Sequence, residues 1–236
     1  MGAETRLTLA GGFELTVDGA PVDLGHSSAR VLAYLALAGR SVLRSRIAGD
    51  LWQDSTEPRA ATSLRTALWR LPACCDALVS RRGSYLAIAP VVMVDVTELV
   101  SACPTLAQRS IDPPAVRRLG RLAELLPGWS DTWVIVERER LRLLWLDALE
   151  AAASRCVAAG RPAEGVDLAT IAIRVEPLRE TAWRLVIRAH HGRGNIAAVV
   201  GCYEDYRRLL HAELGVTPSA LMERLMADCG VGRASV

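Results

Sequence analysis

The chain has 236 residues, of which 51 % are apolar and 5 % are aromatic, and its formal net charge is +2. This length suggests one large domain or two small ones, and the scarcity of aromatic residues leaves Leu and Ala to fill the interior, which favours helices. The net charge alone does not indicate a nucleic-acid partner, and no apolar run approaches membrane-spanning length, so no membrane partner is expected.

The first predicted elements are strands. Apolar and polar residues alternate over residues 6–24, and Asp18-Gly19 supplies the tight turn of a hairpin. The apolar positions of this alternation are Leu7, Leu9, Phe13, Leu15, Val17, Val22 and Leu24. The sequence therefore predicts a small antiparallel sheet at the start of the protein.

Three helices are expected next, over about 28–38, about 45–52 and about 58–71. The first buries Val31, Leu32, Leu35 and Ala36, and Gly39 ends it. The second buries Ile47, Ala48, Leu51 and Trp52. Pro58 suits the first position of the third helix, where Ala61, Leu64, Leu68 and Leu71 form one apolar stripe. Pro72 stops that helix, and residues 78–88 then read as two short strands around Arg81, Arg82 and Gly83.

A helix that reads DNA needs an apolar back and a polar, basic front, because base edges in the major groove offer hydrogen-bond patterns to side chains. The third helix has both, and residues 40–82 carry a local excess of four positive charges. By itself such a helix is more often an ordinary solvated surface, so the interpretation depends on the whole order of sheet, three helices and basic hairpin. The candidate DNA-binding residues are Arg59, Thr62, Ser63, Arg65, Thr66, Trp69, Arg70, Arg81, Arg82 and Gly83.

The rest of the chain reads as helical almost throughout. A long amphipathic helix over 137–158 turns Leu141, Leu144, Trp145 and Leu149 inward, and a last helix is expected at about 218–228. Gly160 and Gly194 each separate two helices and lie 34 residues apart, the period of tetratricopeptide-type helix pairs. We therefore predict a mainly α protein with a small β part, consisting of a winged helix-turn-helix over 1–93 and an all-α helical domain over 94–236.

Cysteine and histidine spacing indicates no metal site. The six cysteines form no CxxC pair, and the four histidines have no partners at zinc-ligand spacing. We interpret the cysteines as reduced, mostly buried residues of a cytoplasmic protein. There is no phosphate-cradling glycine loop and no nucleophile elbow, so neither a cofactor nor an enzymatic activity is expected.

Several segments together resemble one family, the Streptomyces antibiotic regulatory proteins. The run RVLAYLALAGRSVLRSRIAGDLWQD, followed by SLRTALWRL and RRGSYL, is similar to their OmpR-type winged helix. The segments ERERLRLLWLDALEAAA, VEPLRETAWRLVIRAH and YEDYRRLLHAELGVTPS resemble the bacterial transcriptional activation domain of the same family. The chain departs from the family pattern at Trp69, usually a small polar residue, and at Pro72, where Arg is usual.

The resemblance implies a transcription activator that binds direct repeats of double-stranded DNA near promoters, as a homodimer, and recruits RNA polymerase in part through its sigma factor. Secondary-metabolite gene clusters, such as those for antibiotic biosynthesis, are the implied targets. It places Arg65, Thr66, Trp69 and Arg70 on the reading helix, and Arg81, Arg82 and Gly83 on the wing. The alternative is a protein-interaction module that keeps the regulator fold and binds DNA weakly or not at all. Two alternatives stay open for the C-terminal helices. They could form a supporting bundle that binds no partner, or they could bind a small-molecule effector.

Overall fold

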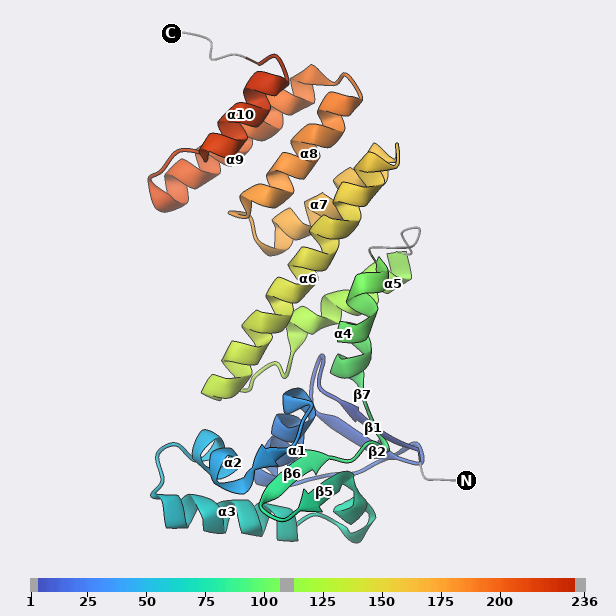
Figure 1. Ribbon diagram of the computed structural model, residues 1–236, viewed down its shortest axis with the longest axis vertical. Helices are drawn as coiled ribbons and strands as arrows, with labels where there is room; N and C mark the ends of the chain where they lie inside the picture. Colours follow the sequence, from blue (N-terminus) through green and yellow to red (C-terminus); the bar gives the residue numbers. More distant parts are fainter. Residues whose placement is uncertain (1–3, 107–112, 232–236) are drawn as a thin grey trace. The chain divides into compact units, whose positions relative to one another are not determined.

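The computed structural model describes residues 4–106 and 113–231. Residues 1–3, 107–112 and 232–236, which fall within the predicted domains, lie outside the described residues. The chain forms two compact units that interleave in sequence, Met1–Ala102 with Arg117–Leu143 and Cys103–Val116 with Leu144–Val236 (Figure 1). The predicted fold class is confirmed: a small β part lies at the N-terminus and the remainder is helical. The boundary between residues 93 and 94 stays a prediction.

The first unit contains a four-stranded sheet. Its strands are β1 (Thr5–Thr8), β2 (Glu14–Val17), β3 (Ala20–Pro21) and β7 (Val92–Val94), in the order β3-β2-β1-β7. Asp18 and Gly19 have φ angles of 51° and 77°, as the predicted tight turn requires. The parallel pairing of β7 with β1 was not predicted. It places the segment around the predicted boundary inside the sheet of the first unit.

Asp95 fastens this sheet to the next helix. It follows β7 directly, begins α4 (Asp95–Leu106) and is buried. The backbone N–H groups of Leu9 and Ala10 donate to its two carboxylate oxygens, each at 3.0 Å. Buried polar groups need such partners, and this carboxylate satisfies two donors at the end of β1 at once.

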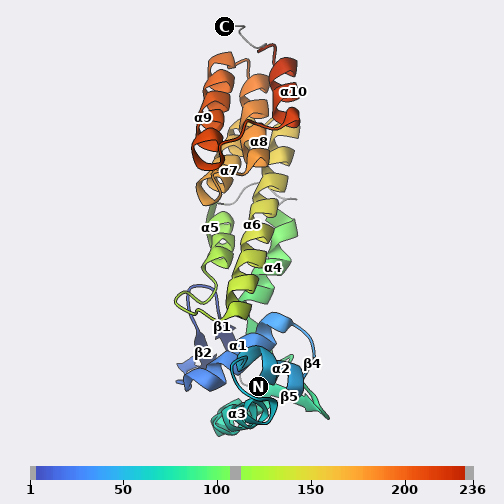
Figure 2. The ribbon, with the colours of Figure 1, turned by 90° about the vertical axis from the view of Figure 1, so that its left-hand side faces the viewer.

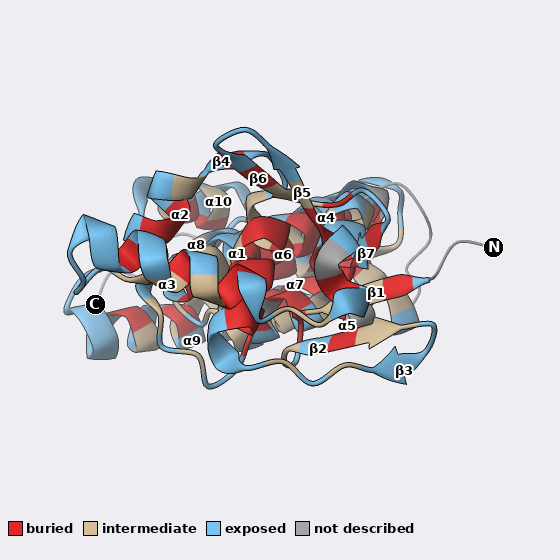
Figure 3. Cartoon of the chain, turned by 90° about the horizontal axis from the view of Figure 1, so that it is seen from below, coloured by how far each residue is buried: buried red, intermediate tan, exposed pale blue. Residues whose placement is uncertain are grey.

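The three predicted helices are present as α1 (His26–Ala38), α2 (Arg44–Leu51) and α3 (Glu57–Trp69). The predicted apolar stripe of α1 is confirmed, because Val31, Leu32, Leu35 and Ala36 are all buried. Figure 3 shows buried, red turns along α1. Gly39 ends α1 with a φ of 59°, in the left-handed region where glycine carries no steric penalty. In α2, Ile47, Ala48 and Leu51 are buried as predicted, whereas Trp52 is half-buried beyond the helix end.

The predicted apolar stripe of α3 was partly wrong. Its buried residues are Ala60, Leu64, Ala67 and Leu68, while Ala61 is exposed. The helix also ends at Trp69, and Leu71 lies half-buried beyond it. The predicted and the observed apolar stripes share Leu64 and Leu68. They differ in whether Ala61 or Ala60 faces the core, and this difference sets the rotation of α3 about its own axis. The observed choice turns Arg65 and Trp69 outward and leaves Ser63 nearer the core.

The predicted hairpin is confirmed as the wing. It consists of β5 (Val79–Arg82) and β6 (Tyr85–Ile88), preceded by the 3-10 helix η1 (Ala73–Leu78). Arg82 pairs with Tyr85, which leaves Gly83 and Ser84 as the turn, and Gly83 has a φ of 58°. A two-residue strand that was not predicted, β4 (Val42–Leu43), pairs with β6 and completes a three-stranded sheet in the order β4-β6-β5.

The first unit also holds the start of a long helix. After α5 (Pro113–Gly120) and η2 (Arg121–Glu124), α6 runs over Thr132–Ala158, and its residues up to Leu143 belong to this unit. The Trp129 ring contacts the rings of Phe13, His26 and Trp133, with centroids 6.0, 5.0 and 6.3 Å away. Arg30 of α1 forms a half-buried ion pair with Asp131. These contacts hold the first turn of α6 against α1.

The second unit consists of helices. The later part of α6 is followed by α7 (Pro162–Val175), α8 (Glu180–Gly192), α9 (Ile196–Leu214) and α10 (Ala220–Asp228) (Figure 2). Leu141, Trp145 and Leu149 of α6 are buried as predicted, and Leu144 is half-buried. Gly160 and Gly194 have φ angles of 74° and 69° and each lies between two helices, as the repeat predicts. A core that includes Ile187, Val199, Tyr206 and Met222 joins α8, α9 and α10.

Glu180 of α8 holds the segment between α9 and α10 in place. Gly215 ends α9 with a φ of 69°, and Ser219 caps α10 by accepting from the N–H groups of Leu221 and Met222. The Ser219 N–H and hydroxyl both donate to the Glu180 carboxylate, the N–H at 2.9 Å. One carboxylate of α8 therefore fixes the start of α10.

Candidate nucleic-acid interface

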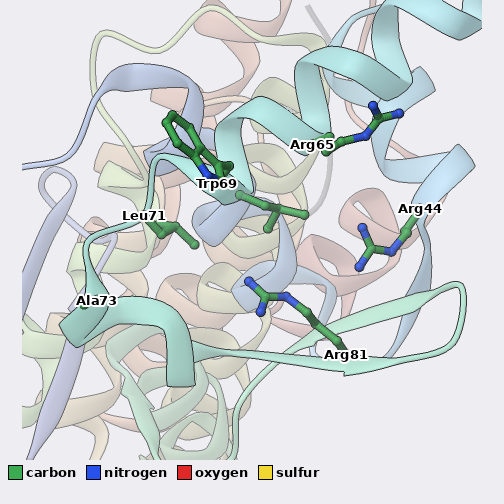
Figure 4. A pocket seen from close by; sticks show the side chains of 7 residues that line it. Arg44, Arg65, Trp69, Leu71, Ala73 and Arg81 are labelled. Atoms are coloured by element: carbon green, nitrogen blue, oxygen red, sulfur yellow. The ribbon is translucent and has the colours of Figure 1, made fainter.

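A cleft of about 530 Å³ opens between α3 and the wing. Figure 4 shows its lining, in which Arg81 extends from β5 towards the end of α3, where Trp69 and Leu71 lie. The lining residues are Arg44, Arg65, Leu68, Trp69, Leu71, Ala73 and Arg81. The cleft therefore brings together two predicted residues of the third helix and one predicted residue of the hairpin.

The charge of this lining has one sign. It includes three guanidinium groups, those of Arg44, Arg65 and Arg81, and no carboxylate. Arg65 and Arg81 are exposed, and Arg44 is half-buried. Guanidinium groups offer forked N–H donors that match phosphate oxygens in geometry and charge. The arrangement suits an extended polyanion passing between helix and hairpin.

Arg44 was missed by sequence reasoning. It begins α2 directly after β4, and its backbone N–H donates to the Ser84 carbonyl in the wing turn at 2.9 Å. This bond ties the start of α2 to the hairpin, which is why Arg44 lies opposite Arg65. Its side chain belongs to the local arginine excess, but the pairing of β4 with β6 was needed to place it.

Trp69 is the most exposed large apolar side chain of the described residues, with 82 % of its surface open. It is the last residue of α3, and Arg70 caps the helix by donating its N–H to the Thr66 carbonyl at 3.0 Å. An isolated exposed apolar residue is ordinary, but a large ring beside three arginines is a combination typical of nucleic-acid surfaces.

The other predicted site residues lie around the cleft without lining it. Arg59, Thr62, Arg70, Arg82 and Gly83 are exposed, and Ser63 and Thr66 are half-buried. The hydroxyls of Thr62 and Thr66 donate to the carbonyls of Pro58 and Thr62, at 2.9 and 3.0 Å. A phosphate oxygen only accepts hydrogen bonds. Each of these hydroxyls must therefore give up its bond to the helix carbonyl before it can donate to a phosphate. Arg82 follows Arg81 along β5, so the two side chains leave opposite faces of the hairpin.

The cysteines fit their predicted role as small apolar residues. None of the six forms a disulfide with a described residue, and Cys75, Cys103, Cys156 and Cys229 are buried. Burial, with a smaller contribution from neighbouring Cys74, raises the pKa of the Cys75 thiol to about 12. Across residues 4–106 and 113–231, no cluster of three or more His, Cys, Asp or Glu side chains could hold a metal ion. In the same residues, no helix combines the length and the apolar character needed to cross a bilayer.

The chain combines a winged helix, which carries an arginine-lined cleft, with a region of paired helices. Residues 119–228 match the bacterial transcriptional activator domain. The chain is 30 % identical over 222 residues to the regulatory protein AfsR of Streptomyces coelicolor, and 28 % identical over 221 residues to AfsR of Streptomyces griseus. These alignments cover 88 % of this chain and 22 % of each relative, so the chain spans about a fifth of their length. The chain therefore contains the bacterial transcriptional activator domain and is similar over most of its length to these Streptomyces regulators, in agreement with the resemblance to the Streptomyces antibiotic regulatory proteins.

A solved structure has the same fold. Mycobacterium tuberculosis EmbR, in complex with a low-affinity phosphopeptide, superposes with a TM-score of 0.74 over 97 % of this chain at 18 % identity. The match covers 65 % of the EmbR chain. The family and the fold thus agree with the resemblance found in the sequence.

Proposed function

We propose that this transcriptional regulator binds DNA in a sequence-specific manner through α3 and the wing and activates transcription. The observation that supports the proposal is the cleft itself, where Arg44, Arg65 and Arg81 converge without a carboxylate. A phosphodiester backbone held there would receive charge-assisted hydrogen bonds from both sides. The outer face of α3, with Arg59 and Arg65 exposed, would then face base edges in the major groove.

The finer steps follow from the family. We propose that two copies bind side by side on direct repeats near a promoter. RNA polymerase, including its sigma factor, would be recruited by these bound copies. Secondary-metabolite genes are the proposed targets, and the cytoplasm is the proposed location. AfsR and this family are regulatory, which supports a role without enzymatic activity.

The alternative is an adaptor that keeps the fold and works by holding a partner. The early end of α3 at Trp69 favours it, because a shorter helix presents fewer side chains to a groove. The two functions differ in one measurable property. Binding through arginine–phosphate contacts releases counterions, so the affinity falls steeply with salt.

The test selects DNA fragments from a random pool with the full chain and measures affinity by fluorescence anisotropy over a salt series. Each phosphate contact adds about 0.9 to the slope of log affinity against log salt. Arg81→Ala should lower the magnitude of that slope by about 1 and should weaken binding to all DNA sequences about equally. Arg65→Ala should also lower the slope by about 1 if Arg65 holds phosphate in the cleft, and should instead cost about 1–3 kcal/mol and relax base preference if Arg65 reads a base edge.

Arg174→Ala is the matched control, because Arg174 is an exposed arginine of α7 without a hydrogen bond or ion pair to any described residue. It should bind DNA like the wild type. Absence of saturable binding at low salt would reject the DNA-binding function and leave the adaptor. Wild-type affinity and slope in both Arg65→Ala and Arg81→Ala would show that DNA binds elsewhere.

A further inference from the structure

The first unit contains a second cavity, away from α3, and we infer that it binds a small aromatic monocarboxylate. The cavity has a volume of about 590 Å³ and lies between α1, α2 and the first turns of α6. Small-molecule sites are typically hollows of roughly 300–1,000 Å³ with apolar walls and a few polar groups. All of its lining residues belong to the first compact unit.

Aromatic rings form part of the cavity wall. The rings of Tyr34 and Trp133 meet edge to face, with centroids 5.5 Å apart. Apolar side chains that include Leu37, Val42 and Val136 complete the wall, and Val136 is 60 % exposed. A planar ring fits such a surface, because aromatic pairs gain from offset and edge-to-face contact beyond the area they bury.

Most of the charges around the cavity are already paired. Arg46 lies 3.6 Å from Asp50, and Arg140 lies 2.8 Å from Glu137. The Tyr34 hydroxyl also donates to Asp50 at 2.5 Å, and burial together with Asp50 raises the Tyr34 pKa to about 12. These groups therefore contribute little net charge towards a ligand.

Arg40 is the exception. It is exposed at the rim, two residues beyond the end of α1, and has no hydrogen bond or ion pair with any residue that the structure describes. Its guanidinium can form a forked, charge-assisted pair with one carboxylate. With three arginines and two carboxylates, the lining carries one net positive charge, which favours a monoanion over a nucleotide with several phosphates.

The position of the cavity suggests how a ligand would act. Its lining includes Arg46 and Asp50 of α2, and α2 packs against α3. A ligand would contact both α2 and α6, and would therefore stabilise the unit that carries the cleft. An effect on DNA affinity rests on the proposed function, whereas binding of the ligand does not.

The experiment measures binding by isothermal titration calorimetry with the full chain and no DNA. Three probes share one ring system and differ in charge: indole-3-acetate is an anion, indole-3-ethanol is neutral and tryptamine is a cation. Indole-3-acetate should bind saturably and about tenfold more tightly than indole-3-ethanol, the factor expected for one charge-assisted hydrogen bond. Tryptamine should bind least.

Arg40→Ala should remove the tenfold preference for indole-3-acetate, whereas the matched control Arg193→Ala, an exposed arginine of the second unit, should keep it. Val136→Glu places a negative charge at an exposed position of the wall and should abolish binding of indole-3-acetate without unfolding the chain. Thermal unfolding checks that each variant folds. No saturable binding of indole-3-acetate, equal binding of the anion and the neutral probe, or an undiminished preference in Arg40→Ala would each overturn the inference.

Discussion

Trp69→Ala tests the interface most sharply, because it should separate DNA affinity from stability. In the free protein the Trp69 side chain is 82 % exposed, so its removal leaves almost no cavity in the fold. In a DNA complex the same ring, at the mouth of the arginine-lined cleft, would pack against a sugar or a base. The variant should therefore bind DNA more weakly while it unfolds much like the wild type.

The expected magnitudes follow from the exposed area. A tryptophan side chain can bury about 150–250 Å², so about 120–200 Å² of Trp69 is open at 82 % exposure. If DNA covers half of this area, burial at about 25 cal/mol per Å² stabilises the complex by about 1.5–2.5 kcal/mol, or about 10- to 70-fold in affinity. The small covered remainder costs the fold about 1 kcal/mol, which the better helix propensity of alanine partly offsets.

Fluorescence anisotropy on a selected DNA fragment gives the affinity, and urea unfolding gives the free energy of unfolding. Leu221→Ala is a suitable control, since Leu221 is 53 % exposed on α10 of the second unit. It should leave DNA affinity unchanged and lower the free energy of unfolding by about 1 kcal/mol, because about half of the leucine side chain is covered. If Trp69→Ala binds DNA as tightly as the wild type, the ring does not reach DNA and the proposed orientation of α3 is wrong.

Three further predictions concern the fold. Asp95→Ala should lower the free energy of unfolding in urea by about 3 kcal/mol, because the buried N–H groups of Leu9, Ala10 and Val96 lose their acceptor. Removal of the half-exposed carboxylate in Glu98→Ala should cost less than about 1 kcal/mol. Gly165→Ala should destabilise by about 1–3 kcal/mol, because its Cβ would lie 2.7 Å from a Val157 methyl and 3.1 Å from a backbone carbonyl. Gly201→Ala, with open space in α9, should stabilise by about 0.5–1 kcal/mol, and an equal effect of both glycine changes in thermal unfolding would refute the close approach. Burial, then the charge of Glu180, raises the Tyr206 pKa from 10.0 to about 12, so the folded chain keeps a proton that the unfolded chain loses, and stability should fall as the pH rises from 10 to 12, less so in Tyr206→Phe.

Local pattern predicted the helices of the winged domain but not the rotation of α3. Gly39 marked the end of α1 and Pro72 the limit of α3, because glycine and proline act on the backbone directly. The choice between Ala60 and Ala61 as the buried alanine depends on what α3 packs against. Hydrophobicity cannot separate two adjacent alanines, so the nearly full exposure of Trp69, a predicted DNA-binding residue, became clear only in the structure.

The strands that form by long-range pairing could not be predicted from the sequence. Strands β4 and β7 have two and three residues, too few for an alternation to be recognised. Each matters because of its partner: β4 places Arg44 beside the wing, and β7 places Asp95 under the end of β1. The cavity lined by Arg40 and Trp133 joins segments about ninety residues apart, and no short motif could announce it.

The modest net charge of +2 is compatible with binding to a polyanion, because at physiological salt exposed charges interact over only about 8 Å. A bound phosphate would sense the guanidinium groups of Arg44, Arg65 and Arg81 far more than acidic residues elsewhere in the chain. Acids such as Glu137, Glu139 and Glu204 are paired with arginines three residues along their own helices, and such pairs project little field. The distribution of charge is therefore more informative than the net charge. Neutralising one cleft arginine should lower DNA affinity more than neutralising several arginines of those helical pairs.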